Sequence, residues 1–548
     1  MVSGNDSEKQ YSIELSGRWV THTIEDMLFS SAGDSCFNNL FIHHLCDGDG
    51  GICSTSIIEF LRSQNTHYAF ILVTPEKIFA ATDQIRSIPV YYYYEDSTFH
   101  ISNSARTLRS ITNTHEVHLD SLEEYLLSGY VHQDRTLYKS LMAASAGQLL
   151  DFDRQNSELS INQYFTYLPS SSECSSIDSA IHKFGTTLDE IFSDLVTTMK
   201  DRPVWVPLSG GLDSRLVLCK LIEHGCKHVT AFTYGHKFSH EMKMARHISE
   251  LLDVHWIGLP STSRNLTTLY RSSIRNEYAD YSDGLHMTPV LLDFEGLYKI
   301  KKRRLVDSDA IIINGYSGDF LFGGHIPETL AFSPSLNNIV KHLVDKNCSH
   351  ISTPNIKSPK SRVFNNILTQ LSDLNYDYSA ATLSCSLYEH WDWKERQPKA
   401  VVNGQRLYEF FGLEWRLPFW DKRLLSFWSS MPVHLKINQL LHLRYLKQYN
   451  YRGAFNSLRS TNQIWPRWSR WIPYAGFPIQ LLGTREHKEY FYEYMFYHSY
   501  FNYQLRLFGR REYNKIFPFT RRPRVIPLAA INRLKELGID PARYLKQQ

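Results

Sequence analysis

The feature that most constrains the fold is a regular alternation of apolar strands and helical segments between residues 204 and 316. The apolar runs read "VWVPL", "HVTAFTY", "VHWIGL" and "AIIINGY". Between the first three lie "DSRLVLCKLIEHG" and "SHEMKMARHISELLD", both with helical periodicity. Strands that alternate with helices of about 10–15 residues are typical of parallel βαβ units. We therefore predict a doubly wound α/β domain in the middle of the chain.

A second domain precedes this one. The chain has 548 residues, too many for one core. Its first 167 residues contain short strand-like runs, such as "YAFILVT", "KIFAATD" and "FHISNS", separated by turn residues. A serine-rich stretch at 168–178 lacks apolar periodicity and predicts a linker. Residues 179–548 then form the second domain, with mostly helical structure beyond about residue 325.

The turn after the first strand of the alternation predicts a phosphate site. Ser209, Gly210 and Gly211 separate that strand from a helix that begins near Asp213 and Ser214. Glycines let the backbone approach an anion, and free N–H groups at a helix start attract it. Asp213 would repel bare phosphate, so we expect Mg²⁺ between them. The GxxxxGK[ST] pattern of a P-loop is absent. The alternative is a plain tight turn with Asp213 as helix cap.

A second loop predicts the partner of Asp213. "NGYSGDFLFGGH", residues 314–325, follows the strand "AIII" and so lies at the carboxyl edge of the predicted sheet. Asp319 would face Asp213 there, and two carboxylates beside phosphates suit a shared Mg²⁺. Charge neutralisation by that ion would assist departure of pyrophosphate. Otherwise Asp319 is a turn residue beside glycine.

These motifs resemble those of ATP pyrophosphatases, and more narrowly those of the asparagine synthetase family. The resemblance extends to "FAATDQIRSIPVYYYYEDSTFHISNSARTL", "SGYVHQDRTLYKSLMAASAGQLLDFD" and "LEWRLPFWDKRLLSFWSSMPVHLK". It implies an α+β Ntn-hydrolase-like sandwich over 1–167, followed by an α/β doubly wound ATP-pyrophosphatase (HUP-like) domain with a helical C-terminal extension. ATP and Mg²⁺ are the implied cofactors. The implied ATP and pyrophosphate contacts are Leu208, Ser209, Gly210, Gly211, Asp213, Ser214, Phe232, Thr233 and Gly315.

The resemblance also marks Glu241 and His255. The family has a carboxylate that opens a helix at the first position and a histidine on the next strand at the second. Glu241 can equally be a favourable charge in a first helical turn, and His255 an ordinary strand residue.

Tyr316 departs from the asparagine synthetase pattern, which has a glutamate there, and is similar to β-lactam synthetases. In those enzymes a tyrosine pairs with a distant glutamate to deprotonate an amine. The implied catalytic pair here is Tyr316 with Glu395. A phenol with a pKa of about 10 is a poor base at neutral pH, but beside a carboxylate it can relay a proton. The alternative is that Tyr316 is a packing aromatic residue and Glu395 a solvated helix residue.

Two further departures bear on activity. The family pattern Lys-x-x-Leu-Arg has Leu440 in place of its lysine, before Leu443 and Arg444. Phe320 replaces the acid that normally follows the aspartate of the 314–325 motif. Loss of a cation near the transition state raises the barrier. Either Lys447 or Arg444 substitutes for the lysine, or the protein is catalytically impaired.

A glutamine-dependent member of the family uses an N-terminal cysteine as nucleophile. The sequence starts Met1-Val2-Ser3, and the first cysteine is Cys36. We therefore expect the amidotransferase fold without glutaminase activity. Nitrogen then comes from free ammonia or from an amine substrate, as in β-lactam synthetases and lasso-peptide cyclases, and Tyr316 favours the amine.

Composition places the chain among ordinary globular proteins. The balance of 59 basic and 56 acidic residues argues neither for nor against an acidic partner, and we expect no nucleic acid. Eight scattered cysteines, no apolar leader and no long apolar run predict a cytoplasmic protein without a membrane span. Two C-terminal segments, "LRSTNQIWPRWSRWIPYAGF" and "LRLFGRREYNKIFPFTRRPRVIP", interleave basic and aromatic residues. They could contact RNA, an anionic membrane surface or an acidic acceptor. The alternative, favoured by a net charge near zero, is a solvated face around an acceptor pocket.

The predicted function is ATP-dependent amide formation through an acyl-adenylate. The alternatives are asparagine formation from aspartate and ammonia, and a degenerate synthetase that serves as a scaffold. The acid, the amine and the oligomeric state are left open by the sequence.

Overall fold

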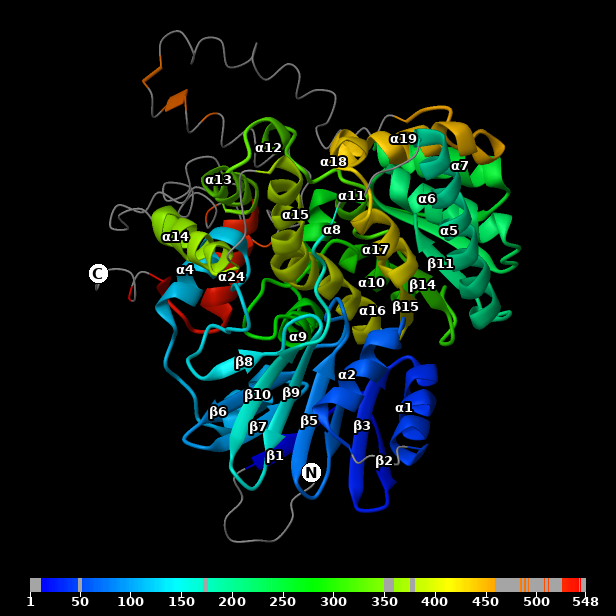
Figure 1. The fold of residues 1–548 in the computed structure, drawn as a ribbon. Helices are drawn as coiled ribbons and strands as arrows, with labels where there is room; N and C mark the ends of the chain where they lie inside the picture. Colours follow the sequence, from blue (N-terminus) through cyan, green and yellow to red (C-terminus); the bar gives the residue numbers. More distant parts are fainter. Residues whose placement is uncertain are drawn as a thin grey trace.

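The fold was analysed in a computed structural model of the chain (Figure 1). The structure describes residues 11–47, 52–170, 176–237, 239–348, 359–374, 380–458, 483–484, 487–488, 491, 507, 511, 525–541 and 543. The Met1-Val2-Ser3 start lies outside these residues. So do nearly all residues of the two basic, aromatic segments. Among the described helices, none has the length and apolar character needed to cross a membrane.

The N-terminal domain contains two β-sheets packed face to face. One sheet has the order β1-β7-β6-β8 and the other the order β10-β9-β5-β4-β3-β2. The larger sheet is antiparallel throughout. The strands are β1 (Tyr11–Glu14), β2 (Val20–Ile24), β3 (Met27–Gly33), β4 (Tyr68–Val73), β5 (Lys77–Thr82), β6 (Tyr91–Glu95), β7 (Thr98–Ser102), β8 (Leu141–Ala143), β9 (Gln148–Asp153) and β10 (Glu158–Gln163).

Two cores show why this domain is a sandwich. Ile71, Ile78, Phe99, Ile101 and Phe152, from both sheets, form the core between them. A second core joins the opposite face of the larger sheet to α1 (Ser35–Asp47) and α2 (Ser54–Ser63), while α3 (Ala105–Ile111) contacts the smaller sheet. The alternation of side chains along each strand thus buries both faces of the sheets. This is the predicted α+β sandwich.

The second domain is built on a five-stranded parallel sheet with the order β13-β12-β11-β14-β15. Its strands are β11 (Val204–Pro207), β12 (Val229–His236), β13 (His255–Ser261), β14 (Ile311–Ile313) and β15 (Glu414–Arg416). Three helices alternate with the strands: α5 (Ile177–Met199), α6 (Leu212–Glu223) and α7 (His240–Leu252). The four predicted strands are confirmed. The fifth strand, β15, was not predicted, because a strand of three residues is too short to show an alternating pattern.

The strand order places a topological switch at β11. The chain moves outward from β11 through β12 to β13, then returns to the other side of β11 as β14. The loops after β11 and β14 therefore leave neighbouring strands at the carboxyl edge of the sheet, where doubly wound sheets bind ligands. Both glycine-containing loops of the sequence lie at this point.

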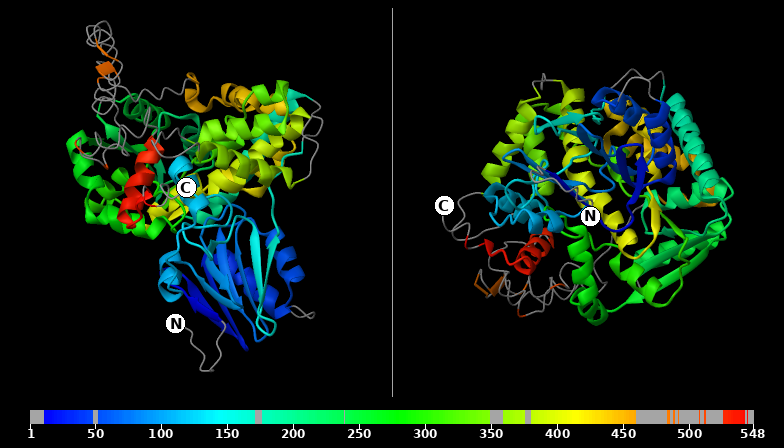
Figure 2. Two further views of the ribbon diagram at one scale, coloured as in Figure 1. Left: turned by 90° about the vertical axis from the view of Figure 1, so that its left-hand side faces the viewer. Right: turned by 90° about the horizontal axis from the view of Figure 1, so that it is seen from below.

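The rest of the described chain is mostly helical, as expected (Figures 1 and 2). Its longer elements are α4 (Leu119–Ser128), α8 (Ser263–Tyr270), α9 (Ser273–Ser282), α10 (Phe294–Lys302), α13 (Leu336–Asn347), α14 (Pro359–Ser372), α15 (Ala381–Trp391), the π-helix η1 (Asp392–Val401), α17 (Lys422–Ser429), α19 (Leu440–Tyr449) and α24 (Val525–Glu536). Shorter turns include α11 (Gly318–Leu321), α12 (Thr329–Phe332), η2 (Val402–Gln405), α16 (Arg406–Phe410) and α18 (Val433–Lys436).

The two domains are joined by backbone hydrogen bonds and by α24. Val131 and Leu137 donate backbone N–H groups to the carbonyls of His286 and Leu285, at 2.7 and 2.9 Å. Helix α24 packs against α4, as Figure 2 shows, and Ala530 and Leu534 share a core with Tyr125 and Leu126.

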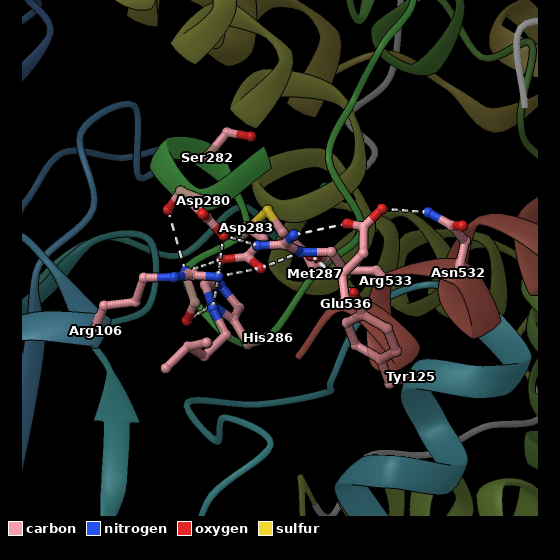
Figure 3. Close-up of polar contacts among 12 residues, drawn as sticks. Arg106, Tyr125, Asp280, Ser282, Asp283, His286, Met287, Asn532, Arg533 and Glu536 are labelled. Carbon is pink, nitrogen blue, oxygen red and sulfur yellow. Dashed lines mark hydrogen bonds and ion pairs between the residues drawn. The ribbon is translucent and has the colours of Figure 1, made fainter. Parts of the chain in front are cut away.

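A charged cluster accompanies this contact (Figure 3). Asp283 is fully buried and accepts from Arg106 of the N-terminal domain at 2.5 Å and from Arg533 of α24 at 2.7 Å. The carboxylate therefore ties three separate segments of the chain together.

Candidate functional site

The loop after β11 closes on itself and leads directly into α6. The Ser209 and Ser214 hydroxyls lie 3.0 Å apart, and Ser209 Oγ accepts from the Gly211 N–H at 3.1 Å. Arg215 Nη2 donates to the Gly210 carbonyl at 3.1 Å. Ser209 is exposed, so the turn faces outward from the sheet edge. The N-terminal end of a twelve-residue helix behind this turn favours anions.

Two glycines let the loop after β14 pack directly on this turn. A Cβ at Gly315 would lie 2.9 Å from the Asp213 carbonyl carbon and the Ser214 nitrogen. A Cβ at Gly318 would lie 2.5 Å from Cγ of Asp213. Both distances are too short for any other residue, so the glycines explain how the two loops meet. The structure thus brings residues 213–214 and 315–318 into contact at the switch point.

Asp213 and Asp319 lie close enough for their charges to interact. Burial and the Asp319 charge raise the pKa of Asp213 to about 8, and a hydrogen bond from the Asp319 backbone only partly opposes this shift. The side chain of Asp319 remains 61% exposed. Two carboxylates whose charges interact offer hard oxygen donors, the set that Mg²⁺ prefers. The residues present therefore fit a divalent cation.

His325 orients Asp319 from the opposite side. Its Nε2 lies 3.0 Å from Asp319 Oδ2, and its Nδ1 lies 2.8 Å from Asp392 Oδ2. Burial opposes protonation, but Asp392 and Asp319 together raise the pKa of His325. The sequence motif contained His325 without indicating this role, because Asp392 is distant in the chain.

The π-helix η1 links the candidate site to the domain interface. Gln397 accepts from the Ser317 hydroxyl at 2.8 Å and donates to Asp392 at 2.9 Å. Lys399 Nζ donates to the carbonyls of Val131 and Gln133 at 2.8 and 2.7 Å. The wider turn of a π-helix often occurs at functional sites, and no sequence pattern indicated it.

Tyr316 is bonded to a carboxylate that the sequence analysis did not single out. Its hydroxyl donates to Asp293 Oδ2 at 2.9 Å. Tyr234 donates to Oδ1 of the same residue at 2.5 Å, and Tyr408 donates to Oδ2. Burial raises the pKa of Asp293, although the three hydroxyl donors oppose this shift. A buried carboxylate with three phenol donors is an unusual arrangement at the carboxyl edge of the sheet.

Glu395 occupies a different place from the one expected. It is buried and accepts from Lys399 at 2.6 Å and from the Gln133 backbone at 2.8 Å. Burial opposes ionisation, but the Lys399 charge lowers the pKa of Glu395 to about 2. These contacts belong to the domain interface and do not join Glu395 to Tyr316. The Tyr316 hydroxyl thus contacts Asp293, and the pairing of Tyr316 with Glu395 stays a prediction. Glu395 is buried, so it is not a solvated helix residue.

The residues of the predicted nucleotide wall lie at the carboxyl edge of the sheet, as expected. The Leu208 N–H donates to the Phe232 carbonyl at 2.9 Å, and Thr233 Oγ1 donates to the Leu208 carbonyl at 2.7 Å. All three residues are buried. The backbone N–H and carbonyl of Leu208 are thus both hydrogen-bonded to residues of β12. That a nucleotide binds against this wall stays a prediction.

Glu241 and His255 lie at different places along the sheet. A Cβ at Gly210 would lie 3.5 Å from Glu241 Cγ, so Glu241 borders the glycine turn, and burial raises its pKa. His255 is exposed and is the first residue of β13, at the amino edge of the sheet. It therefore lies on the strand that follows the Glu241 helix, as the resemblance implies, and a functional role for it stays a prediction.

Leu440 opens α19 close to the 314–325 loop. A Cβ at Gly323 would lie 2.3 Å from the Lys436 carbonyl, and one at Gly324 would lie 2.4 Å from Gln439 Nε2. Lys436 is buried in an ion pair with Glu389 at 2.6 Å, and Arg444 and Lys447 are exposed. Phe320 is fully buried and stacks on Trp420, so it serves the core.

Among the described residues, one other cluster has three potential metal ligands: Asp189, Glu223 and His224. Lys220 Nζ already lies 2.6 Å from Asp189 and 2.8 Å from Glu223. Because Lys220 already pairs with both carboxylates, its charge opposes the binding of a metal cation there.

Comparisons with known proteins cover both domains. A family model described as asparagine synthase matches residues 187–452, and one described as a glutamine amidotransferase domain matches residues 58–165. A Methanocaldococcus jannaschii protein with the provisional name asparagine synthetase [glutamine-hydrolyzing] 2 is 23% identical over 280 residues. The alignment covers 48% of this chain and 51% of that relative, so the chain spans about half the length of the curated protein.

Solved structures were also compared. The glutamine phosphoribosylpyrophosphate amidotransferase of B. subtilis is 9% identical, with 66% of this chain and 77% of that chain covered and a TM-score of 0.18. The glutamine-dependent NAD+ synthetase of Acinetobacter baumannii is 15% identical, with 36% and 42% covered and a TM-score of 0.16.

Proposed function

Because the chain belongs to the asparagine synthetase family, we propose that it is an ATP-dependent ligase that joins a carboxylic acid to an amine or to ammonia. In the first step, a carboxylate oxygen of the acid attacks the α-phosphorus of ATP. The bond to the β-phosphate breaks, which gives an acyl-adenylate and pyrophosphate. In the second step, the nitrogen attacks the acyl carbon, AMP leaves and one proton is lost.

The observation that carries the proposal is the contact between the two glycine loops at the switch point. Ser209, Gly210, Gly211 and Ser214 offer hydroxyl and backbone donors at the start of α6 to the pyrophosphate part of ATP. The backbone of Leu208 and Gly315 and the wall at Phe232 and Thr233 would border the nucleoside.

Asp213 and Asp319 would hold Mg²⁺, because the charge of Asp319 acts on the buried Asp213 carboxylate and both offer oxygen ligands. The ion, when bound, neutralises charge on the pyrophosphate. His325 holds the Asp319 carboxylate in place through Nε2 and is itself held by Asp392.

The proton released in the second step would pass through Tyr316. As the amine N–H bond breaks, its proton moves to the Tyr316 oxygen, and the original phenol proton moves along the 2.9 Å hydrogen bond to Asp293 Oδ2. Asp293 takes the role first expected of Glu395. Its upward-shifted pKa makes it a better proton acceptor than an ordinary aspartate.

Pyrophosphate release from ATP, measured with a panel of amino, peptide and sugar acids, tests the proposal. We expect release with at least one acid and a loss of about 100-fold or more in Asp213→Asn. Asp201→Asn is the matched control, because Asp201 is 77% exposed and precedes the other end of β11. If the wild-type protein binds ATP but releases no pyrophosphate with any acid, the scaffold alternative is favoured.

The nitrogen source is compared in the same assay. Amide product is measured with ammonia, with primary amines and with glutamine, because a glutamine amidotransferase model matches the N-terminal domain. We expect product with an amine or ammonia and none with glutamine. Aspartate with ammonia as the productive pair would identify simple asparagine formation. Product with glutamine would contradict the expected loss of glutaminase activity.

A further inference from the structure

Two cations share one buried carboxylate beside Asp319. Asp392, the first residue of η1, has a side chain that is only 1% exposed. Lys346 Nζ, from α13, lies 3.3 Å from its Oδ2, and Arg396 Nη1, four residues further along η1, lies 3.7 Å from its Oδ1. His325 also contacts Oδ2, and through its other ring nitrogen it contacts Asp319. Three separate segments thus bring positive charge to the candidate site.

The charges in this group do not balance. Asp392 contributes one negative charge, whereas Lys346 and Arg396 contribute two positive charges even when His325 is neutral. Within the described part of the chain, neither cation forms an ion pair with another carboxylate. Because a buried carboxylate needs one compensating cation, Asp392 does not account for both.

The surplus charge lies beside the predicted metal site and is open to a ligand. The charge of Asp319 acts on both Lys346 and Arg396. Burial raises the pKa of Asp319, but His325 and Arg396 lower it overall. The side chains of Lys346 and Arg396 are 28% and 27% exposed, so solvent reaches them. Lys346 also lies over the Tyr388 ring, at 5.5 Å, which holds it in place without neutralising it.

This surplus occurs in a chain that lacks the lysine expected at position 440. Leu440 follows Gln439, whose side chain borders the glycine turn of the 314–325 loop at Gly324. The nearest basic residue before it, Lys436, is buried in its ion pair with Glu389. The 314–325 loop therefore meets α19 without the expected cation, but it meets Asp392 where two cations are present.

We propose that Lys346 and Arg396 bind the phosphate chain of ATP and supply the positive charge that a lysine at position 440 would supply. The inference rests on the proposed function. When the bond between the α- and β-phosphates breaks, negative charge develops on the departing pyrophosphate oxygen. Two cations placed at that charge lower the barrier to adenylation. The guanidinium fork suits two phosphate oxygens, and the ammonium acts as a point charge.

Binding of pyrophosphate in the presence of Mg²⁺, measured by calorimetry on the full chain, tests the proposal without knowledge of the acid. We expect Lys346→Met and Arg396→Gln each to weaken binding by about 10-fold, and the double variant by about 100-fold. AMP, which lacks the β- and γ-phosphates, should bind all of these proteins equally. Lys341→Met, at an exposed position of α13, is the matched control and should bind pyrophosphate as the wild-type protein does.

The outcomes separate this inference from the proposed function. If the wild-type protein binds pyrophosphate and both single variants bind it equally well, the inference is overturned and the proposed function stands. An equal loss of AMP binding in the variants would also overturn it, because the effect would then be a general disturbance of the site. If the wild-type protein does not bind pyrophosphate at all, both fail.

Thermal unfolding of each variant without ligand shows whether it folds. Should Arg396→Gln not fold, Arg396→Lys replaces it, since this variant keeps the charge and removes only the fork. We expect Arg396→Lys to bind pyrophosphate more weakly than the wild-type protein and more tightly than Lys346→Met. Unchanged binding in both Arg396→Lys and Lys346→Met would refute the site.

Discussion

Asp213 is held in its protonated form, because burial and a neighbouring charge disfavour the carboxylate. Burial and the charge of Asp319 raise its pKa to about 8, whereas an unfolded aspartate titrates near about 3.9. Between these values the native state keeps a proton that the unfolded state has lost. Stability therefore falls as pH rises through this window.

We expect Asp213→Asn to flatten this dependence between about pH 5 and pH 8. The free energy of unfolding, measured by denaturant titration without Mg²⁺, should decline with pH in the wild-type protein and much less in the variant. Addition of Mg²⁺ should raise wild-type stability chiefly above the midpoint of this titration, where Asp213 is ionised. Parallel pH profiles of the two proteins would contradict the shift.

Tyr316 and Asp293 give a second residue-level prediction. Tyr316→Phe and Asp293→Asn should slow amide formation by about 10²–10⁴-fold, while pyrophosphate release persists. Single-turnover measurement of both products separates the steps. Tyr234→Phe, which removes another donor to Asp293, is the control and should have a smaller effect. Unchanged amide formation in Tyr316→Phe would eliminate the relay.

At the level of elements, α24 shows how a distant segment stabilises the domain contact. Arg533 is almost fully buried and donates to Asp283, Asp280 and Glu536. The same helix contributes Leu534 to the core with α4. Because its polar and apolar contacts lie side by side, the helix acts as a structural support of the junction.

Arg533→Ala should lower stability by about 1–3 kcal/mol, since it leaves buried Asp283 with Arg106 as its remaining ion-pair partner. Lys535→Ala, at an exposed position of the same helix, should be nearly neutral. Denaturant titration compares the two. Equal stability of both variants would show that the apolar face of α24 suffices.

For the whole molecule, the interface predicts coupled unfolding of the two domains. Lys399 and Glu395 of η1 are both buried and together bind the 131–133 backbone of the N-terminal domain. Lys399→Met removes the charge that supports Glu395 and should cost about 3–5 kcal/mol.

Calorimetry of the full chain should show one principal transition in the wild-type protein and two separated transitions in Lys399→Met. Lys394→Met, on the same helix and without a described hydrogen bond, is the control. A single, unshifted transition in Lys399→Met would mean that the domains are held by other contacts.

Local patterns in the sequence were sufficient for the sheet and for the two glycine loops. Apolar runs at 204–208, 228–234, 254–259 and 310–316 specify buried parallel strands, and glycines at 210, 211, 315 and 318 permit close approach. Such signals depend on neighbours within a few residues. The tertiary structure decided which carboxylate meets Tyr316: Asp293 lies 23 residues away and Glu395 lies 79 away, and nothing in their local sequence distinguishes them. The same holds for Asp392 beside His325. Side-chain pairing between distant segments is determined by packing of the whole chain, and no short-range pattern records it.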